Sequence, residues 1–408
     1  MISADRQPDL RRKLRRSKSR ARLRGLLLVA PALLLLMVAF VAPIGGMLFN
    51  AVANPEFRSA MPRLADYVRE WDGQELPGEE GYRLLAEEIG RAYSDKTLPG
   101  AAMRLNYEQS GLRSLFMRAG RRADRLEAPY SRSFLELDED WGSISVWQAM
   151  QAASAPFTAR YLLQAVDREI TWDGEIRLVE PEKRVFVDRF EATFWISFVV
   201  TSLCALIGYP MAYAIAAAPP RRARLMLVLL LLPFWTSLLV RTAAWVVLLQ
   251  RDGIINDALI WIGVVDQPVQ LIFNRLGVYI AMTHILLPFM ALPLYSVMKG
   301  ISPNHMRAAA SLGAGPISAF WTVYFPQTVP GLGAGCLLVY VLAIGFYITP
   351  ALVGGSGDQM ISYLIANFAL GTANWSVASA LAIVLLCCVA IFYPFFRRYV
   401  GIDRLRLG

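Results

Sequence analysis

Few residues in this chain of 408 have the types and spacing needed for catalysis or metal binding. The two histidines, His284 and His305, are too few for a histidine metal site. All four cysteines fall in long apolar runs, where no disulfide framework or thiolate site is indicated: Cys204, Cys336, Cys387 and Cys388. No Gly-Lys pair occurs, so the Walker A pattern for ATP is absent. Gly331, Gly333 and Gly335 precede no strand–helix unit, and we expect them to let helices pack closely in lipid.

The segment 300–326 has a residue order typical of two short helices joined by a tight turn. Ser302 is a suitable N-cap, and the proline after it lacks only an N–H that the first helical turn leaves unbonded. The run 304–312 is rich in alanine, which favours a helix. Gly313 suits the left-handed residue that closes a helix, and we expect Pro326 to end or kink the second helix.

The composition places these residues in a membrane protein. Hydrophobic residues make up 56% of the chain and charged residues 18%, with a mean hydropathy of +0.41, whereas soluble proteins are about 25% charged. A helix needs about 20 apolar residues to cross the hydrocarbon core. Six runs are long enough: Leu26–Phe49, Ala192–Ala218, Leu225–Leu249, Leu276–Met298, Thr328–Leu352 and Trp375–Phe396. We therefore predict an all-α, polytopic membrane protein with six transmembrane helices, the first at 26–49.

Basic residues indicate the orientation of these helices. Residues 1–25 carry ten Lys and Arg, three arginines occupy 221–224, and four occupy 397–406. Cytoplasmic segments next to membrane helices are enriched in Lys and Arg. We therefore expect both termini in the cytoplasm, with 1–25 and 401–408 as tails. The net charge of +9 is thus a property of these segments and does not indicate nucleic-acid binding.

Residues 50–189 form a long segment on the outer side, between the first two helices. The stretches 82–92 and 161–170 place apolar residues at helical spacing. We predict a small, mostly helical extracytoplasmic domain, and a partly disordered insertion is the alternative. Ala51-Val52-Ala53 resembles a signal-peptidase site, but the run 26–49 is longer than the apolar part of a signal peptide, which is about 7–15 residues.

Arg241 is the one formal charge within the six apolar runs. Charges at membrane depth usually face the protein interior or a water-filled path, so Arg241 and His284 are candidates for a translocation path or gate. Pro288, Pro293 and Pro350 are expected to break the fourth and fifth helices, and Pro288 and Pro350 join the candidates. The structural alternatives are an ion pair or carbonyl contact for Arg241 and a helix–helix hydrogen bond for His284. Acids at the outer edge could draw cations or form a solvated rim: Glu191, Asp252, Asp257 and Asp358.

The 300–326 loop resembles that of ABC importer permeases. Their cytoplasmic loop reads Glu-Ala-Ala, three residues, Gly, nine residues, then Ile-x-Leu-Pro. Here Arg307-Ala308-Ala309, Gly313 and Val323-Tyr324-Phe325-Pro326 keep that spacing before the fifth apolar run, with Arg307 in place of the glutamate. The segments 233–237 and 348–355 look like the spermidine/putrescine-type branch.

The resemblance implies a type I ABC importer permease fold, with a permease core at 190–400 and the extracytoplasmic insertion at 50–189. It implies a transport subunit, not an enzyme, of an ATP-driven, binding-protein-dependent importer in the bacterial inner membrane. Polyamines or a related small polar solute are the expected substrates, and related branches carry opines, amino-acid derivatives, sulfate or iron. The implied partners are two ATP-binding subunits, which bind ATP and Mg²⁺, a second homologous permease and an extracytoplasmic substrate-binding protein. No cofactor on this chain and no nucleic-acid partner is expected.

In that family the loop docks on the ATPase and transmits its movements. Phe320, Trp321 and Tyr324 lie at i, i+1 and i+4, and we expect them to form an exposed aromatic face that the ATPase covers. The alternative is that they pack against the chain's own helices or the lipid interface. The residues thus assigned to ATPase coupling are Arg307, Ala308, Ala309, Gly313, Phe320, Trp321, Tyr324 and Pro326.

An ion-gradient-driven secondary transporter is the alternative from a different class. It would predict acidic residues within the spans and an internal inverted repeat, and neither is visible. A non-transporting scaffold would leave the loop motif without a use.

Overall fold

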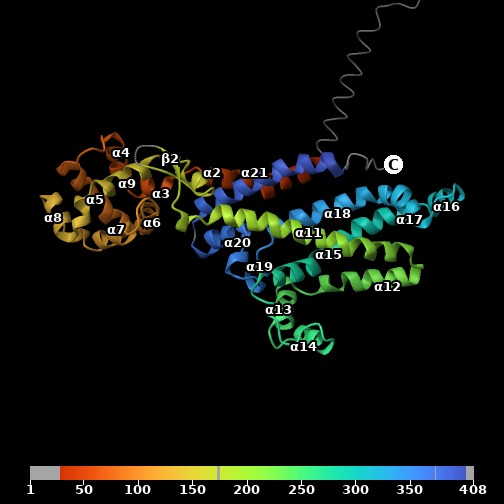
Figure 1. The fold of residues 1–408 in the computed structure, drawn as a ribbon. Coiled ribbons are helices and arrows are strands. Elements are labelled where there is room, and N and C mark those ends of the chain that lie inside the picture. Colours follow the sequence, from red (N-terminus) through yellow and green to blue (C-terminus); the bar gives the residue numbers. More distant parts are fainter. Residues whose placement is uncertain (1–27, 172–174, 373, 401–408) are drawn as a thin grey trace, which may run out of the picture. The chain divides into compact units, whose positions relative to one another are not determined.

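The computed structural model describes residues 28–171, 175–372 and 374–400 (Figure 1). The predicted cytoplasmic tails, 1–25 and 401–408, therefore lie outside the described residues. Contacts divide the chain into two units, the first ending at Phe157 and the second beginning at Thr158. The predicted outer segment 50–189 thus contains a helical domain and, after Phe157, a shorter stretch that belongs to the second unit.

The first unit begins with an apolar helix, Leu28–Asn50, that is exposed along its whole length. It is π-helical over Met37–Val41 and continues as α2, Ala42–Asn50. A compact helical domain follows: α3 Pro55–Ala60, α4 Pro62–Glu70, α5 Glu79–Ser94, α6 Leu98–Glu108, α7 Leu112–Arg121, η3 Ala123–Arg125, α8 Tyr130–Leu137, η4 Glu139–Gly142 and α9 Ile144–Ser154. The prediction of a mostly helical insertion is confirmed.

Aromatic side chains form the core of the helical domain. The indole of Trp141 lies 5.0 Å from the Phe116 ring and 4.9 Å from the Phe134 ring, centroid to centroid. Tyr82 packs edge-on against Trp147 and donates its hydroxyl hydrogen to the Trp141 carbonyl at 2.9 Å. Burial raises the pKa of Tyr82, so the ring remains a neutral donor at physiological pH.

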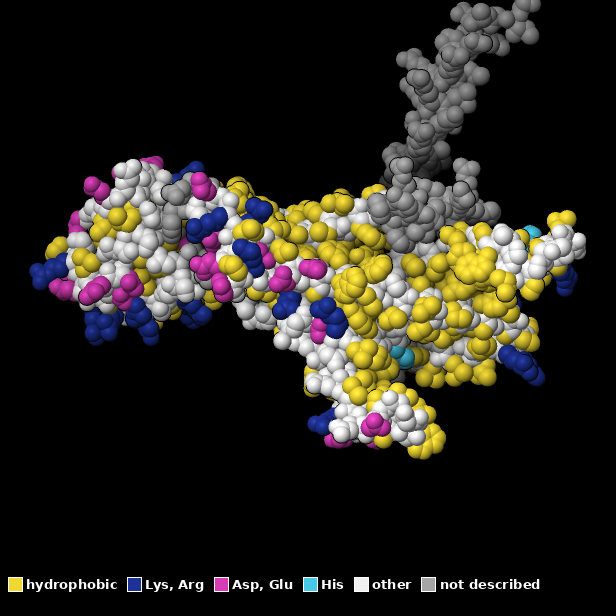
Figure 2. Space-filling view, viewed as in Figure 1, with side chains coloured by type: hydrophobic (Ala, Val, Ile, Leu, Met, Phe, Trp, Pro, Cys, Tyr) yellow, Lys and Arg dark blue, Asp and Glu magenta, His cyan; other side chains and the backbone are white. Residues whose placement is uncertain are grey.

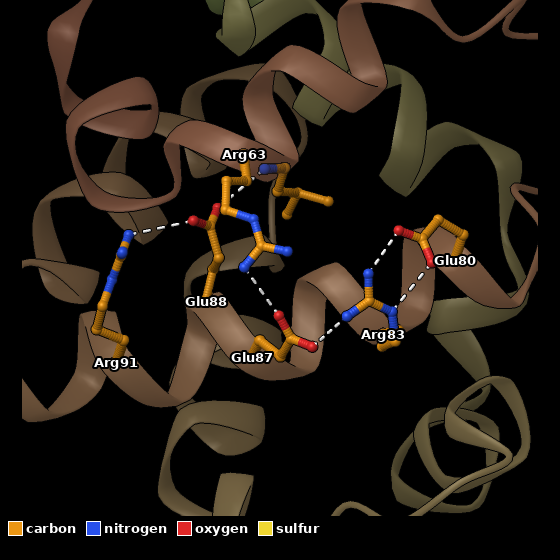
Figure 3. Close-up of polar contacts among 7 residues, drawn as sticks. Arg63, Glu80, Arg83, Glu87, Glu88 and Arg91 are labelled. Atoms are coloured by element: carbon orange, nitrogen blue, oxygen red, sulfur yellow. Dashed lines mark hydrogen bonds and ion pairs between the residues drawn. The ribbon is translucent and has the colours of Figure 1, made fainter.

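Ion pairs and a carboxylate cap join α4 and α5. Along α5, Arg83 bridges Glu80 and Glu87, and Glu87 also pairs with Arg63 of α4 at 3.0 Å (Figure 3). The carboxylate of Glu88 is buried and accepts a hydrogen bond from the Leu64 N–H at 2.9 Å, next to Arg91 (Figure 3). A carboxylate in this position stabilises a helix start, because the first N–H groups have no partner in the helix.

The two ends of the helical domain are tied together at Asn54. Its buried side-chain amide donates to the carbonyls of Ala153 and Ala155, each at 2.9 Å. Its side-chain oxygen accepts from Arg104 Nε at 2.5 Å, and its backbone N–H donates to the Pro156 carbonyl at 3.0 Å. The chain therefore enters and leaves this domain at one place, as expected for an insertion.

The second unit opens with a short helix and a β-hairpin. Helix α10 spans Arg160–Gln164, and strands β1, Arg168–Ile170, and β2, Ile176–Leu178, pair antiparallel with Arg168 opposite Leu178. The prediction of a helix across 161–170 is therefore wrong beyond Gln164, because residues 168–170 bond to β2. The η5 turn, Pro181–Lys183, then leads into the long helices.

The helices of the second unit form an apolar bundle around α11, α15 and α18 (Figure 1). Their bounds, with those of the flanking helices, are α11 Phe186–Ala217, α12 Pro220–Leu231, η6 Leu232–Trp235, α13 Leu238–Leu249, α14 Ile254–Trp261, α15 Arg275–Gly300, α16 Pro303–Ser311, α17 Pro316–Ala319, η7 Phe320–Tyr324, α18 Phe325–Gly345, α19 Ile348–Val353, η8 Ser356–Asp358, α20 Ile361–Ala366, η9 Asn367–Gly371 and α21 Trp375–Val400. Figure 2 shows hydrophobic side chains covering this unit on the face in view.

Glycines allow the three central helices to pack closely. A Cβ at Gly331 would lie 2.9 Å from Val297, and one at Gly335 would lie 2.7 Å from Met290 Sδ. Gly208 of α11 approaches Met290 in the same way, at 2.9 Å. The expectation that the 331–335 glycines serve helix packing is confirmed for these two positions.

Five described helices are long and apolar enough to cross a membrane, and a bent pair makes a sixth if it counts as one span. This pair corrects the third predicted span, because α12 with η6 and α13 with α14 meet at 97° near Thr236 and Ser237. Pro233 lies in the η6 turn just before the bend, where a proline interrupts the helical hydrogen bonds.

The predicted proline breaks also need correction. Helix α15 runs unbroken through Pro288 and Pro293, so neither ends it. The fifth span ends at Gly345, and Pro350 lies after that end, in the separate short helix α19. The all-α, polytopic fold class nevertheless agrees with the observed helices.

Candidate functional site

The first helix of the 300–326 loop has a defined start and a defined end. Ser302 Oγ accepts a hydrogen bond from the Asn304 N–H at 3.3 Å, which caps α16. Gly313 has φ +88°, and the N–H groups of Gly313 and Ala314 donate to the carbonyls of Ala310 and Ala309, each at 3.0 Å. This is the Schellman arrangement, in which a left-handed residue closes the helix. The predictions for Ser302 and Gly313 are confirmed.

The second helix of the loop continues into the bundle. Residues Pro316–Gly345 form one 30-residue helix, with a π-helical turn over Phe320–Tyr324. The helix therefore does not end at Pro326, although an end there was one of the two expected outcomes. The Phe325 N–H bonds to the Phe320 carbonyl five residues back. This wider turn admits Pro326, which has no N–H to donate, without ending the helix.

The predicted aromatic face is divided between the bundle and the surface. Tyr324 packs on Tyr213 of α11 with ring centroids 5.4 Å apart, and Phe320 packs on Tyr209 and Tyr213, each at 6.3 Å. The prediction that all three aromatics are exposed is wrong for Phe320 and Tyr324, because the continuous helix brings them against α11. Trp321 is 58% exposed.

Three exposed apolar side chains mark the outer surface of the loop. Leu312 is 90% exposed, Ile317 75% and Trp321 58%. Leu312 also borders a cavity of about 510 Å³ between α16 and the start of α18, with these lining residues: His305, Ala308, Ala309, Leu312, Ala314, Thr322, Val323 and Gln327. Sequence reasoning missed Leu312 and Ile317, although a leucine beside a turn glycine is a signal that could have been used.

The residues of the Arg-Ala-Ala triplet face different ways. Ala309 is buried, whereas Arg307 and Ala308 are exposed. The guanidinium of Arg307 lies 3.4 Å from Asn304 Oδ1, one turn earlier in α16. Ala309 therefore supports the loop from inside, and Arg307 is available at its surface.

The candidate path residues gather around α13. Trp245 of α13 donates its indole N–H to His284 Nδ1 of α15 at 3.2 Å, so the helix–helix hydrogen bond expected for His284 is present. Thr242 and Thr349 share a hydrogen bond of 3.0 Å that joins α13 to α19, next to Pro350. Sequence reasoning missed Trp245, Thr242 and Thr349, since nothing in the spacing shows that these helices meet.

Arg241 lies at the bend between α12 and α13. Its guanidinium carbon lies 5.9 Å from the centre of the Phe234 ring, within the range of a cation–π contact. Its Nε atom is buried and has no hydrogen-bond partner among the described residues. The ion pair considered as an alternative is not formed within the described part of this chain.

Two apolar cavities meet at His284. One, of about 330 Å³, lies between α11, α12 and α15 and is lined by Pro288 among others. The second, of about 620 Å³, lies between α11, α13 and α15 and is lined by Trp245 and Thr283 among others. His284 and Leu287 border both cavities. The structure thus brings His284 and Pro288 together and places Pro350 in α19, which packs against α13 and α15.

At the start of α11 and α15, charged residues are held in a polar network. Arg275 pairs with Asp358 at 2.8 Å, and Asp358 also accepts from the Gly355 N–H at 3.1 Å. Arg189 donates to the Gly357 carbonyl at 2.7 Å. The suggestion that Asp358 attracts cations is therefore wrong, because this buried carboxylate holds the 354–358 turn.

The sequence matches a family model over most of the second unit. The model describes a binding-protein-dependent transport system inner membrane component, and it covers residues 195–401. The helical domain of the first unit lies outside this match.

Similar proteins are bacterial permeases. The spermidine/putrescine transport system permease protein PotB of Escherichia coli K12 is 34% identical over 215 residues, which cover 53% of this chain and 77% of PotB. The PotB of Haemophilus influenzae is 37% identical over 195 residues, covering 48% and 68%. The inner membrane ABC transporter permease protein YdcU of E. coli K12 is 29% identical over 227 residues, covering 52% and 72%.

A chain of a bacterial ABC transporter involved in the import of the acidic polysaccharide alginate superposes with a TM-score of 0.44. Its sequence is 18% identical, over 54% of this chain and 80% of that chain. The family match extends over half of the chain, and the identity to PotB extends over most of that protein. The chain therefore belongs to the family of binding-protein-dependent transport system inner membrane components, the membrane-spanning subunits of ABC importers.

Proposed function

We propose that this chain is the permease subunit of an ATP-driven importer for spermidine, putrescine or a related small polar solute. The observation that carries the substrate class is the 34–37% identity to permeases named for spermidine/putrescine transport. The positive charge of Arg241 would repel a polyamine on the path. Opines, amino-acid derivatives, sulfate and iron are therefore the alternative substrates.

The chain works with partners that carry the energy and the specificity. A second, homologous permease completes the path, two ATPase subunits bind ATP and Mg²⁺, and an extracytoplasmic protein delivers the solute. The missing Walker A pattern supports a separate ATPase chain. The solute passes between the two permeases, with α13 and its residues Arg241 and Trp245 bordering the path.

Both termini and the 300–326 loop face the cytoplasm in this proposal. The loop and the basic 221–224 segment lie at one end of the bundle, since Tyr213 near the end of α11 contacts Tyr324. The positive-inside rule assigns that end to the cytoplasm. The helical domain of the first unit then lies on the extracytoplasmic side of the membrane.

The 300–326 loop is the ATPase docking site. Leu312, Ile317 and Trp321 are exposed on a segment that a cytoplasmic location would leave in water. Several large, exposed apolar side chains on one short, ordered segment favour an interaction site there. Phe320 and Tyr324, packed on α11, would connect movements of the docked loop to the bundle.

Competition of transport tests the substrate class. The chain is co-expressed with its partner permease, ATPase and binding protein, and the purified complex is placed in liposomes. ATP-dependent uptake of labelled spermidine that excess putrescine suppresses, and that excess sulfate leaves unchanged, would support the proposal. Uptake of labelled sulfate or of an opine instead would contradict the polyamine assignment and leave the permease role intact.

The alternative of an ion-gradient-driven transporter makes a different forecast. It predicts that uptake continues without the ATPase and stops when a proton or sodium gradient is collapsed. The described helices α15 and α18 contain no Asp or Glu that could bind a coupling cation.

A further inference from the structure

Arg307 is an isolated charge on the proposed docking surface. It is the only Lys, Arg, Asp or Glu between residues 300 and 326, and no Asp or Glu occurs between Asp266 and Asp358. Its described contact is with the neutral side chain of Asn304, at 3.4 Å. The permease itself therefore offers no nearby carboxylate within this stretch of sequence.

The loop defines the place of Arg307 on a helix with fixed ends. The Ser302 cap and the Gly313 turn close α16 at both ends. Within α16, Arg307 shares a face with Asn304 and Ser311, and the Ser311 hydroxyl donates to the Arg307 carbonyl at 3.0 Å. Leu312 follows Ser311 directly and is also exposed, on a neighbouring side of the helix. A partner that covers the C-terminal half of α16 thus comes close to both Leu312 and Arg307.

Among the described residues, the charges on the helices that adjoin the loop have one sign. The start of α12 carries Arg221, Arg222 and Arg224, and Lys299 lies in the last turn of α15, where α16 begins. No Asp or Glu occurs in 192–251 or 267–357, the segments that contain these residues. Figure 2 shows dark-blue and no magenta side chains at the α16 end of the bundle on the face in view. A surface of this kind is complementary to an acidic partner.

We infer that the ATPase subunit presents a carboxylate to Arg307, at the edge of an apolar cleft that receives Leu312 and Trp321. This inference rests on the proposed function, since it names the chemistry of the surface that covers the same loop. A covered guanidinium without an anionic partner would lose its water and gain nothing in return. Arg is suited to the pairing, because its planar fork donates two parallel hydrogen bonds to one carboxylate.

Arg307 has the opposite charge to the glutamate that the motif carries at this position. A cleft built for the motif's glutamate would offer a cation or N–H donors, and it would repel Arg307. The permease and its ATPase are therefore expected to form a matched pair, and an ATPase from a system with the glutamate should bind this loop poorly.

Charge reversal at one residue tests the inference. The full-length permease complex is placed in lipid nanodiscs, and binding of its partner ATPase is measured by titration at low salt. The wild type is compared with Arg307→Lys, Arg307→Gln and Arg307→Glu. Glutamate favours helices as well as arginine does and suits the first half of a helix, so Arg307→Glu should leave α16 folded. Arg113→Glu, at an exposed site of the helical domain, controls for the change in net charge.

We expect Arg307→Glu to weaken ATPase binding about tenfold or more, because it places two carboxylates together. Arg307→Lys should stay within about threefold of wild type, and Arg307→Gln should lower the salt sensitivity of binding. Binding of the ATPase by Arg307→Glu that equals or exceeds that of wild type would overturn the inference. Unchanged binding is also the result expected if Arg307 faces an anionic lipid surface and not the ATPase. If Leu312→Ala with Trp321→Ala still weakens binding in that case, docking at the loop survives. If the wild type binds no ATPase, both proposals fall.

Discussion

Replacement of Gly313 by valine should uncouple the permease while leaving it folded in the membrane. Gly313 has φ +88°, and a Cβ built there meets no atom within 4 Å. The substitution therefore causes no clash, and its cost is the backbone conformation alone. An L-residue in the left-handed region costs about 1–2 kcal/mol, and a β-branched residue is disfavoured further.

If Gly313→Val costs about 2 kcal/mol, the ratio of loops with the native turn to loops in other conformations falls about 30-fold, at about 1.4 kcal/mol per factor of ten. Because the turn sets the angle between α16 and the helix that begins at Pro316, ATP-dependent uptake should fall, with about 30-fold as the upper bound of the loss. Gly313→Asn, which tolerates the left-handed region, should keep most activity.

Gly315 offers a matched control two residues away. Its φ is −67°, in the extended region, and a Cβ there also meets no atom within 4 Å. Gly315→Val therefore makes the same chemical change without the backbone cost. Uptake and membrane abundance are measured for both variants in proteoliposomes. Equal uptake by Gly313→Val and Gly315→Val would refute the reasoning that the left-handed turn is required.

Four further outcomes are expected. Leu312→Ala with Trp321→Ala should release the ATPase on purification, with an affinity loss of about 30-fold or more, because exposed apolar anchors dominate such interfaces; unchanged retention would count against docking. A cysteine at Asp140 should react with a membrane-impermeant maleimide added outside intact spheroplasts, and reaction only after lysis would contradict the topology. Asn54→Ala removes three side-chain hydrogen bonds and should destabilise the helical domain by about 3 kcal/mol, measured as faster limited proteolysis between residues 54 and 157. Hydrogen bonds from Ser131 and Tyr130 lower the pKa of Glu79 in the folded protein. The contribution of Glu79 to the free energy of unfolding is therefore present above the unfolded pKa and is lost as the pH falls through the lower folded pKa. Glu79→Gln should make the loss of stability in acid less steep, as measured by unfolding at a series of pH values.

The long helices and the loop turn could be predicted because local rules determine them. Apolar length predicted the spans, and Ser302 and Gly313 have local roles that residue type alone indicates. The bend at Thr236–Ser237 was missed because the length of an apolar run does not indicate where a helix changes direction. The helix through Pro326 was missed because it depends on a π-helical turn, with a hydrogen bond between residues five apart, and no residue pattern in the sequence predicts such a turn.

The candidate site was only partly predictable, since contacts between distant helices decide the rest. Phe320 and Tyr324 looked like a docking face, but their environment depends on Tyr209 and Tyr213, more than 100 residues earlier. Asp358 looked like a free acid until Arg275 was found beside it. Spacing along one segment indicates which residues share a face, and it does not indicate what that face meets.

Site-specific cross-linking tests the central claim that the 300–326 loop docks the ATPase. A photoreactive amino acid is placed at Leu312, which is 90% exposed, and in a matched variant at Leu178 of the hairpin, which is 51% exposed. After irradiation of membranes that contain the co-expressed ATPase, we predict a permease–ATPase product from position 312 and none from position 178. No ATPase product from position 312, or equal products from both positions, would contradict the account.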